Sequence, residues 1–485
     1  MPLSVHAVVA LLNAVAMLQC LIAGIVPAAP TEFQLFIQST LDVTPTDSTF
    51  FVGLLETALV AVYCLATVAV GHLSKTIPPF SLLFRGLVLW LASVLVCGAA
   101  RPCHSFPILL AGRMTTGAAE ATVRVLALPL IEHLTPPPQR SLHVGIYYAG
   151  MCLASGVAYV YGSITARALG WDWAFYLGAV TMLPCLAVCH LACRHPILHL
   201  LPPQPLNHCG SMLSPSPPPS TRIADDLGVV LSCPVFVFSA LGSGAINFTI
   251  QAMSTFAPAI LVGLGVFTEP YAAPVFGALV MLSGLVGGPL AGLLLDRATR
   301  GHEDEDIFRC AAACAHRLPF LVVVLVAGGA STLVLAFAPS LTVLFAATML
   351  VLNTSLFATL GSTSISMLLS VPPQHRELAM GVGLLIQNLV GNVPGPIVVG
   401  ALTSWLAPGC GSVEVGQINP ECTRDTNQQG LLSVWILMVG WLLWAQVAWP
   451  IAFVRARHRV ALAKMFASGR NSTKKTAFVC MVDVA

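Results

Sequence analysis

Three ionisable residues, Arg113, Glu120 and Arg124, stand within one apolar stretch, residues 106–132. A charge inside a membrane span costs about 2.5–3.5 kcal/mol on insertion scales, so such residues usually have a function. Measured from Arg113, steps of 7 and 11 residues turn a helix by about −20° and +20°, and they climb about 16 Å. The spacing therefore predicts that all three side chains form one stripe along a single helix face.

Glu56 lies in the apolar stretch 50–73, at a depth similar to that of Arg113. The two can pair, which leaves Glu120 with Arg124 one helical turn away. Two acids and two bases then form a neutral set, which lowers the cost of burying them. A structural alternative is a permanent salt-bridge network that holds the two helices together, and for Glu56 alone that role is the commoner one.

The functional interpretation gives these residues distinct tasks. Arg113 or Arg124 would bind the anionic group of a substrate, because a guanidinium fits carboxylate and phosphate well. Glu120, with Glu56 as a second candidate, would couple transport to protons by being neutral in one state and paired in another. Apolar packing would hold helices together at lower cost, so we favour the functional interpretation for the stripe.

Uncharged polar residues are weaker candidates for substrate binding. Asn247, Gln251 and Gln387 lie in apolar stretches and could line a cavity. Polar side chains also tie membrane helices together, at about 0.6 kcal/mol each, and that is the simpler explanation. Tyr147 and Tyr148 fall near one end of the stretch 142–164, and we expect them at the membrane interface.

Nothing in the sequence predicts a cofactor, a metal site or catalysis. Cys310 and Cys314, with the nearby His302 and His316, do not match a usual metal-ligand spacing. No nucleophile elbow and no GxxxxGK[ST] loop occurs, so an enzyme or an ATP-driven pump is not expected. A net charge of +2 without a basic domain makes nucleic acid an unexpected partner. A disulfide between Cys410 and Cys422 is plausible if their loop is not cytosolic.

The elements that position these residues follow from the composition. Of the residues, 56% are hydrophobic and 9% are charged, against roughly 25% charged in a soluble domain. A spanning helix needs about 20 apolar residues. The sequence contains twelve such stretches, which are 4–29, 50–73, 80–100, 106–132, 142–164, 171–193, 233–263, 271–295, 317–338, 341–370, 378–405 and 430–454.

These stretches divide into two sets of six around a segment rich in proline and serine, residues 195–226, which we interpret as a flexible linker. The predicted divisions are an N-terminal six-helix half (1–194), the linker, a C-terminal six-helix half (227–456) and a basic tail (457–485). Seventeen lysine and arginine residues fall on the side of the predicted membrane that holds both termini, three fall on the opposite side, and two lie inside the membrane. Both termini are therefore expected in the cytosol.

After the eighth stretch the chain reads GLLLDRATRG from Gly292, which resembles the G-xxx-D-R-xx-R loop of the major facilitator superfamily. The resemblance implies two six-helix halves around a central cavity, and a lock between helix ends made by Gly292, Asp296, Arg297 and Arg300. The matching loop of the first half, GHLSK from Gly71 to Lys75, keeps the glycine and a basic residue but has no acid.

Within that superfamily, three stretches resemble the Spinster branch: GLLETALVAVYCLATVAVGHL from Gly53, the block from Gly112 to Gly162, and FVFSALGSGAINFTIQAMSTFAPAIL from Phe236. The resemblance implies export of lysophospholipids or sphingosine-1-phosphate, with Arg113 and Glu120 at the family's helix 4 positions. Spinster proteins carry an Asp-Arg pair where this chain has Leu18-Gln19. The stretch from Gly391 to Gly411, with Cys422, looks more like the organic-anion transporting polypeptides.

We therefore predict a secondary transporter that moves an amphiphilic or anionic organic solute, lysolipid-like, by alternating access. Its expected partners are that substrate, membrane lipids and possible coupling protons. Bulky organic anions are the alternative substrate class. A receptor or scaffold that kept the fold without transporting is the alternative function. The sequence leaves open whether the protein resides in the plasma membrane or an endolysosomal membrane.

Overall fold

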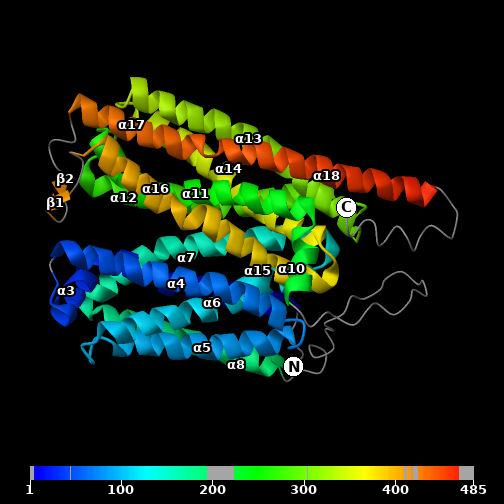
Figure 1. Ribbon diagram of the computed structural model, residues 1–485, viewed down its shortest axis with the longest axis horizontal. Coiled ribbons are helices and arrows are strands. Elements are labelled where there is room, and N and C mark those ends of the chain that lie inside the picture. Colours follow the sequence, from blue (N-terminus) through cyan, green and yellow to red (C-terminus); the bar gives the residue numbers. More distant parts are fainter. Residues whose placement is uncertain are drawn as a thin grey trace.

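The computed structural model describes residues 5–43, 45–193, 223–302, 304–408, 412–414, 417–418 and 424–468. Almost all of them are helical, and Figure 1 shows the helices running roughly along one axis. Eleven helical stretches are long and apolar enough to cross a membrane. The helix α6 is as long as its neighbours but carries Arg113, Glu120, Arg124 and Glu132, so hydropathy alone passes over it. With α6 the bundle has the expected twelve spans.

The N-terminal half contains the first six spans and one extra helix. Its elements are α1 (Val5–Ala23), α2 (Ile25–Ala28), α3 (Pro30–Leu41), α4 (Pro45–Leu73), α5 (Pro79–Ala99), α6 (Phe106–Leu134), η1 (Pro137–Gln139), α7 (Arg140–Ala168) and α8 (Trp171–Cys193). The extra helix α3 follows the first span, where the sequence predicted a loop. It forms because Phe33 and Phe36 bury their rings against Trp171.

The C-terminal half contains the other six spans. Its elements are α10 (Ile223–Leu231), α11 (Pro234–Gly263), α12 (Glu269–Ala298), α13 (Asp306–Phe337), α14 (Thr342–Ser370), η2 (Pro373–His375), α15 (Arg376–Gln387), η3 (Asn388–Asn392), α16 (Pro394–Leu406), β1 (Ser412–Glu414), β2 (Gln417–Ile418), α17 (Asp425–Gly440) and α18 (Leu443–Ser468). The two strands pair antiparallel. The eleventh span consists of α15, the π-helical turn η3 and α16, and the twelfth consists of α17 and α18.

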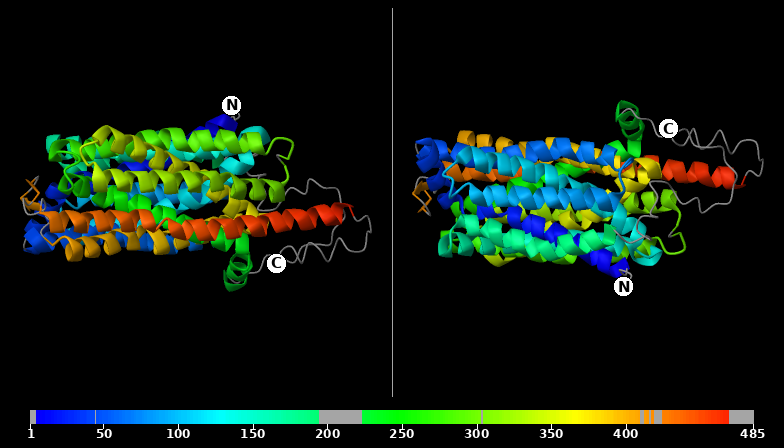
Figure 2. Two further views of the ribbon diagram at one scale, coloured as in Figure 1. Left: turned by 90° about the horizontal axis from the view of Figure 1, so that it is seen from above. Right: turned by 90° about the horizontal axis from the view of Figure 1, so that it is seen from below.

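Several boundaries differ from the sequence prediction. The ninth span begins at Asp306, not near residue 317, so Arg309 and Arg317 belong to a helix and not to a loop. The predicted linker boundary at residue 226 falls inside α10, whose hydrophobic side packs against α11 and α15. Helix α18 continues to residue 468, well past the predicted end of the half, and Figure 2 shows it leaving the bundle along the bundle axis. Cys410 and Cys422 lie outside the described residues.

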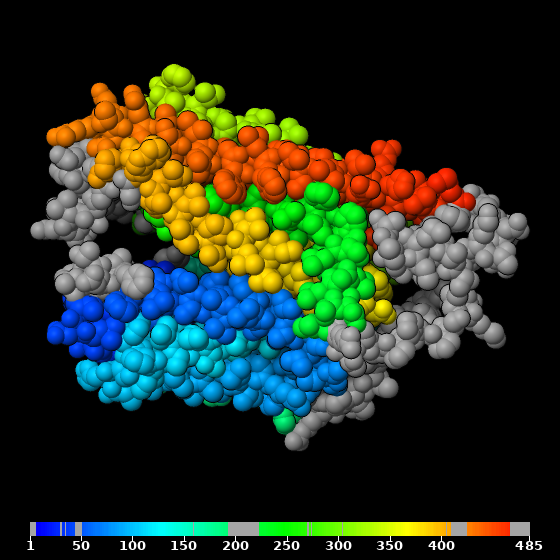
Figure 3. All heavy atoms as spheres, viewed as in Figure 1, coloured from blue at the N-terminus to red at the C-terminus, as the bar shows by residue number. Residues whose placement is uncertain are grey.

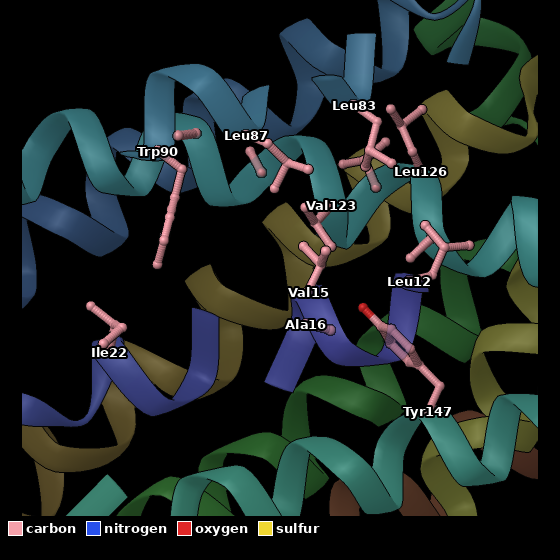
Figure 4. Close-up of a cluster of buried hydrophobic side chains, with 14 of the residues drawn as sticks. Leu12, Val15, Ala16, Ile22, Leu83, Leu87, Trp90, Val123, Leu126 and Tyr147 are labelled. Carbon is pink, nitrogen blue, oxygen red and sulfur yellow. The ribbon is translucent and has the colours of Figure 1, made fainter. Parts of the chain in front are cut away.

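The hydrophobic core of the N-terminal half lies between α1, α5, α6 and α7. Figure 4 shows Val123 and Leu126 of α6 pointing at Leu83 and Leu87 of α5. Every labelled residue of this cluster is at least nine-tenths buried. The core therefore fixes the rotation of α6, and with it the direction of the charged stripe.

The two ends of the bundle differ. We call the end where α4, α6, α12 and α14 finish the linker side, and the end that carries β1 and β2 the strand side. At the linker side, α4 packs against α15 and α7 packs against α12, so the halves meet. Figure 3 shows the surface hollowed between α4 and α16 at the strand side. The described residues of the two halves therefore meet at the linker side, whereas the visible face is hollowed between them at the strand side.

Candidate functional site

The helix that carries the charged stripe, α6, is an inner helix of its half. It packs against α4 and α5, touches α1, α3 and α7, and also reaches α15 of the opposite half. Small residues permit this close packing, since a Cβ added at Gly117 would lie 3.1 Å from the Leu59 carbonyl carbon of α4. Because helices surround α6, its charged groups face protein and the space between the halves, not lipid.

Arg113 and Glu56 form the ion pair that their matching depths indicated, joining α6 to α4. The Arg113 side chain is 1% exposed, whereas that of Glu56 is 40% exposed. The guanidinium also donates a hydrogen bond of 3.5 Å to the Ala23 carbonyl at the end of α1. In this conformation Arg113 is therefore occupied by protein groups on two other helices, α4 and α1.

Glu120 lies at the middle of α6, and it is 4% exposed. The predicted pair between Glu120 and Arg124 does not form, because the Arg124 guanidinium extends toward α1 and α7 instead of folding back along α6. Among the residues that the structure describes, Glu120 Oε1 has no hydrogen-bond partner, although Arg113 and Arg124 both attract this carboxyl electrostatically. Glu120 is thus a buried carboxyl group without a close ion pair.

Arg124 has an unusual environment for a buried guanidinium. It donates to the Cys20 sulfur of α1 at 3.0 Å and to the Met151 sulfur of α7 at 3.1 Å. Among the described residues no carboxylate lies within 4 Å of it. Thioether and thiol sulfurs are weak acceptors, so most of the hydrogen-bonding capacity of this cation is unused. The Arg124 residue is only partly buried.

Tyrosines surround Arg124 from two helices. Tyr63 of α4 and Tyr147 of α7 are close enough to interact with it electrostatically. Figure 4 shows the Tyr147 hydroxyl pointing toward α1 near Ala16, and no described residue forms a hydrogen bond with it. Tyr148 bonds Ser364 of α14 at 2.6 Å, across the two halves. Tyr147 and Tyr148, which we expect at the membrane interface, lie about two turns into α7, which begins at Arg140.

The amide candidates of the C-terminal half are partly brought together. Asn247 of α11 donates to Gln387 of α15 at 3.3 Å, next to the π-helical turn η3. Within that turn Asn392 donates to Asn388 at 3.1 Å. Gln251 lies one turn further along α11 and is exposed. The structure thus forms an amide cluster on one half and a cationic group on the other.

Sequence reasoning missed the role of Arg317, which it counted among the loop charges. This side chain is fully buried in α13, where it bonds Ser239 at 2.9 Å and Ser366 at 3.1 Å. Its guanidinium also lies over the Trp449 ring, 4.8 Å from the centroid. The contacts join four helices of the C-terminal half. The sequence prediction started the ninth span at residue 317 because continuous apolar residues begin only after Arg317, whereas the helix begins at Asp306.

The loop lock predicted after α12 is present in part. Both Asp296 carboxylate oxygens accept hydrogen bonds from α7, from the Ser141 amide at 2.9 Å and the Leu142 amide at 2.8 Å. A carboxylate there satisfies free amides at the start of a helix. A Cβ added at Gly292 would lie 2.7 Å from the Leu142 Cα, so only glycine permits this approach.

The two arginines of the motif do not take part as expected. Arg297 and Arg300 are exposed, and neither forms an ion pair with a described residue. Their predicted role is taken by Arg309, which pairs with Glu132 at the end of α6, and both of these side chains are almost fully buried. Arg140 adds a longer contact of 3.7 Å to Asp304. The halves are therefore linked by Asp296 of the motif and by Arg309 and Arg140, which lie outside it.

These features match a known family. The family model described as Major Facilitator Superfamily matches residues 10–396. The chain belongs to the major facilitator superfamily. It is therefore a multi-pass membrane transporter and not an enzyme, as the sequence predicted. Members of this superfamily bind small-molecule substrates, and some couple to protons.

Relatives and solved structures agree with this assignment. A probable sphingolipid transporter, spinster homolog 1 of Arabidopsis thaliana, is 27% identical over 373 residues, which cover 73% of this chain and 72% of the relative. The fold is similar to that of the E. coli fucose:proton symporter, at 13% identity and a TM-score of 0.60, covering 94% of this chain and 99% of the other. It is also similar to a bacterial homolog of the human lysosomal transporter Spinster, at 18% identity and a TM-score of 0.52, covering 93% and 97%.

Proposed function

We propose that this transporter carries a lysolipid-like amphiphile with an anionic head group, and that Arg124 binds that group. The observation that carries the proposal is the state of the two candidate arginines. Arg113 is already paired with Glu56, whereas Arg124 donates to two sulfurs and has no carboxylate partner among the described residues. A guanidinium left without a carboxylate near the bundle centre favours a phosphate or carboxylate ligand.

The opposite half supplies the uncharged part of the proposed site. Asn247 and Gln387 form an amide pair that can donate to and accept from a polar linkage of the substrate. Gln251, exposed on the same helix, is the third candidate there. Apolar walls between these groups would hold an acyl chain. Binding between the halves allows a rocking motion to expose the substrate alternately to each side.

Glu120 is our candidate for proton coupling. It is buried, lies between the two arginines, and has one oxygen without a partner in the described part of the chain, so a change in its charge would alter the field at Arg124. Glu56 is the weaker candidate, because its carboxylate already neutralises Arg113. The linker-side closure seen here would be one of the two transport states.

Orientation and location are also part of the proposal. Helix α1 begins at the linker side and helix α18 ends there, as Figure 2 shows. Most lysine and arginine residues belong to that end of the bundle. We therefore place the linker side, both termini and the basic tail from residue 457 in the cytosol. The plasma membrane and an endolysosomal membrane both agree with this orientation.

The test is ligand binding to the purified protein and flux into proteoliposomes that contain it, using a lysophosphatidylcholine, a long-chain base phosphate and a sulfated steroid. Charge-assisted hydrogen bonds contribute about 1.5–3 kcal/mol, so Arg124→Gln should weaken binding of the anionic lipid by roughly 10- to 150-fold. The matched control is Arg101→Gln, which removes an exposed arginine paired with Asp172 at the strand side. Normal binding by Arg124→Gln would refute the proposed anchor.

Two other outcomes separate the alternatives. Transport of the sulfated steroid without transport of either lipid would favour bulky organic anions. Binding of a protein partner, with no flux of any compound at any pH, would favour a receptor. Proton coupling is tested in the same vesicles, where Glu120→Gln should flatten the dependence of flux on pH. An unchanged pH profile would exclude Glu120 as the coupling group.

A further inference from the structure

The short helix α10 lies at the linker side, between the predicted linker and the seventh span. Its nine residues contact both α11 and α15. Two acids follow each other on it, and they have opposite environments. Asp225 is exposed, whereas Asp226 is almost completely buried. A buried carboxylate needs compensating partners, so its surroundings are informative.

Asp226 lies among basic groups from both halves. Its Oδ1 is 2.6 Å from Lys75 Nζ and 3.7 Å from His375 Nδ1, and its Oδ2 is 3.3 Å from His72 Nδ1. Lys75 and His375 also lie 3.1 Å apart. His72 and Lys75 stand at the end of α4, and His375 stands just before α15. One carboxylate from the linker helix thus joins the N-terminal half to the C-terminal half.

The loop motif at the end of α12 in the second half corresponds to the loop at the end of α4 in the first half, and it contains the acid that the first-half loop lacks. There, Asp296 stands four residues after Gly292 and caps the start of α7. In the first half, the residue four after Gly71 is Lys75, so a base stands in the position of the acid. The approach of the backbones is the same, since a Cβ added at Gly71 would lie 2.8 Å from the Leu378 Cα of α15.

A lysine in that place meets the start of α15, where Glu377 attracts it electrostatically but the end of the helix does not. The first turn of α15 presents free amides and the positive end of the helix dipole, which attract a carboxylate and repel an ammonium group. His375 adds a ring that becomes a second cation when it is protonated. Asp226 supplies a negative charge where Lys75, His375 and the start of α15 meet.

We propose that α10 is a detachable third component of the linker-side gate, and that Asp226 provides the acid that the first-half loop lacks. The second-half lock has both of its partners on the spans themselves. The first-half lock holds only while α10 is docked. Opening at the linker side therefore requires Asp226 to leave Lys75 and His375, so any event that moves the linker controls the gate.

The experiment is hydrogen–deuterium exchange of the full-length protein in lipid nanodiscs, without substrate. Asp226→Asn should speed amide exchange in residues 66–75 and 376–382 by about tenfold, because the closed state loses its bridging charge. Asp225→Asn is the matched control, since it removes an equal charge from the exposed neighbour on the same helix. It should leave the exchange of both segments unchanged.

A second variant distinguishes gating from folding. Lys75→Asp combined with Asp226→Asn restores the acid to the loop, so the gate should close without α10. Exchange should then return to the wild-type rate in 66–75 and 376–382 but rise in α10. The proposal is overturned if Asp226→Asn behaves like Asp225→Asn, if it speeds exchange equally in α5 and α8, or if the double variant leaves the gate open.

This inference rests on alternating access but not on the identity of the substrate. A failure of Arg124→Gln to weaken lipid binding would leave the exchange result unaffected. Conversely, an unchanged gate in Asp226→Asn would leave the proposed head-group site untouched.

Discussion

The seam between α7 and α12 offers the sharpest quantitative prediction. Here two glycines from opposite halves, Gly145 and Gly288, bring the helix backbones together. A Cβ added at Gly288 would lie 2.6 Å from the Gly145 carbonyl oxygen, whereas ordinary contacts begin at 3.4 Å. For Gly288→Ala, the helices must therefore separate by about 0.8 Å in the closed state, since a backbone oxygen cannot rotate away as a side chain can.

Overpacking of this kind costs about 1–3 kcal/mol. The penalty falls only on the state that is closed at the linker side, because alternating access separates α7 from α12 there. The ratio of closed to open molecules should then fall by roughly 5- to 150-fold. The gain in helix propensity from glycine to alanine, up to about 1 kcal/mol, applies to both states and so cancels.

The assay is hydrogen–deuterium exchange in nanodiscs, followed in residues 141–150 and 285–295, together with substrate flux in proteoliposomes. Gly277→Ala is the control, because it lies on the same helix with nothing within 4 Å of its added Cβ. Gly288→Ala should speed exchange in both segments and lower the turnover rate, while Gly277→Ala should do neither. Wild-type exchange in Gly288→Ala would show that the close contact does not hold the gate shut.

Two further predictions concern the buried ion pairs. Glu132→Gln or Arg309→Met alone should lower stability by about 3–5 kcal/mol, because each leaves a buried charge unpaired, and the double variant should lose less than the sum. Denaturation in detergent measures this, and strict additivity would refute the coupling. Arg113→Ala should abolish transport while the protein still inserts correctly. If Arg113→Ala/Glu56→Gln restores flux, Arg113 serves only to pair with Glu56 and does not bind cargo.

Local sequence was sufficient for the membrane architecture. Apolar stretches of about 20 residues match the thickness of a bilayer, and this predicts the spans without any knowledge of their neighbours. Helical rotation alone placed Arg113, Glu120 and Arg124 on one face. The roles of Gly292 and Asp296 came from the resemblance to the superfamily's loop motif, which is visible in the sequence because the motif is continuous in the chain. Local reasoning failed for α3, for α10 and for the start of α13, where tertiary packing stabilises helices that hydropathy does not indicate.

The tertiary structure decided which charges are occupied and which are available. Depth matching suggested the pair of Arg113 with Glu56, but only the packing of α1 and α7 turned Arg124 away from Glu120 and toward two sulfurs. The partners of Glu132 and Lys75 come from distant parts of the chain, Arg309 and Asp226. Sequence periodicity describes one helix at a time, whereas a buried ion pair depends on two helices meeting at the same depth and rotation. That information exists only once the bundle has formed.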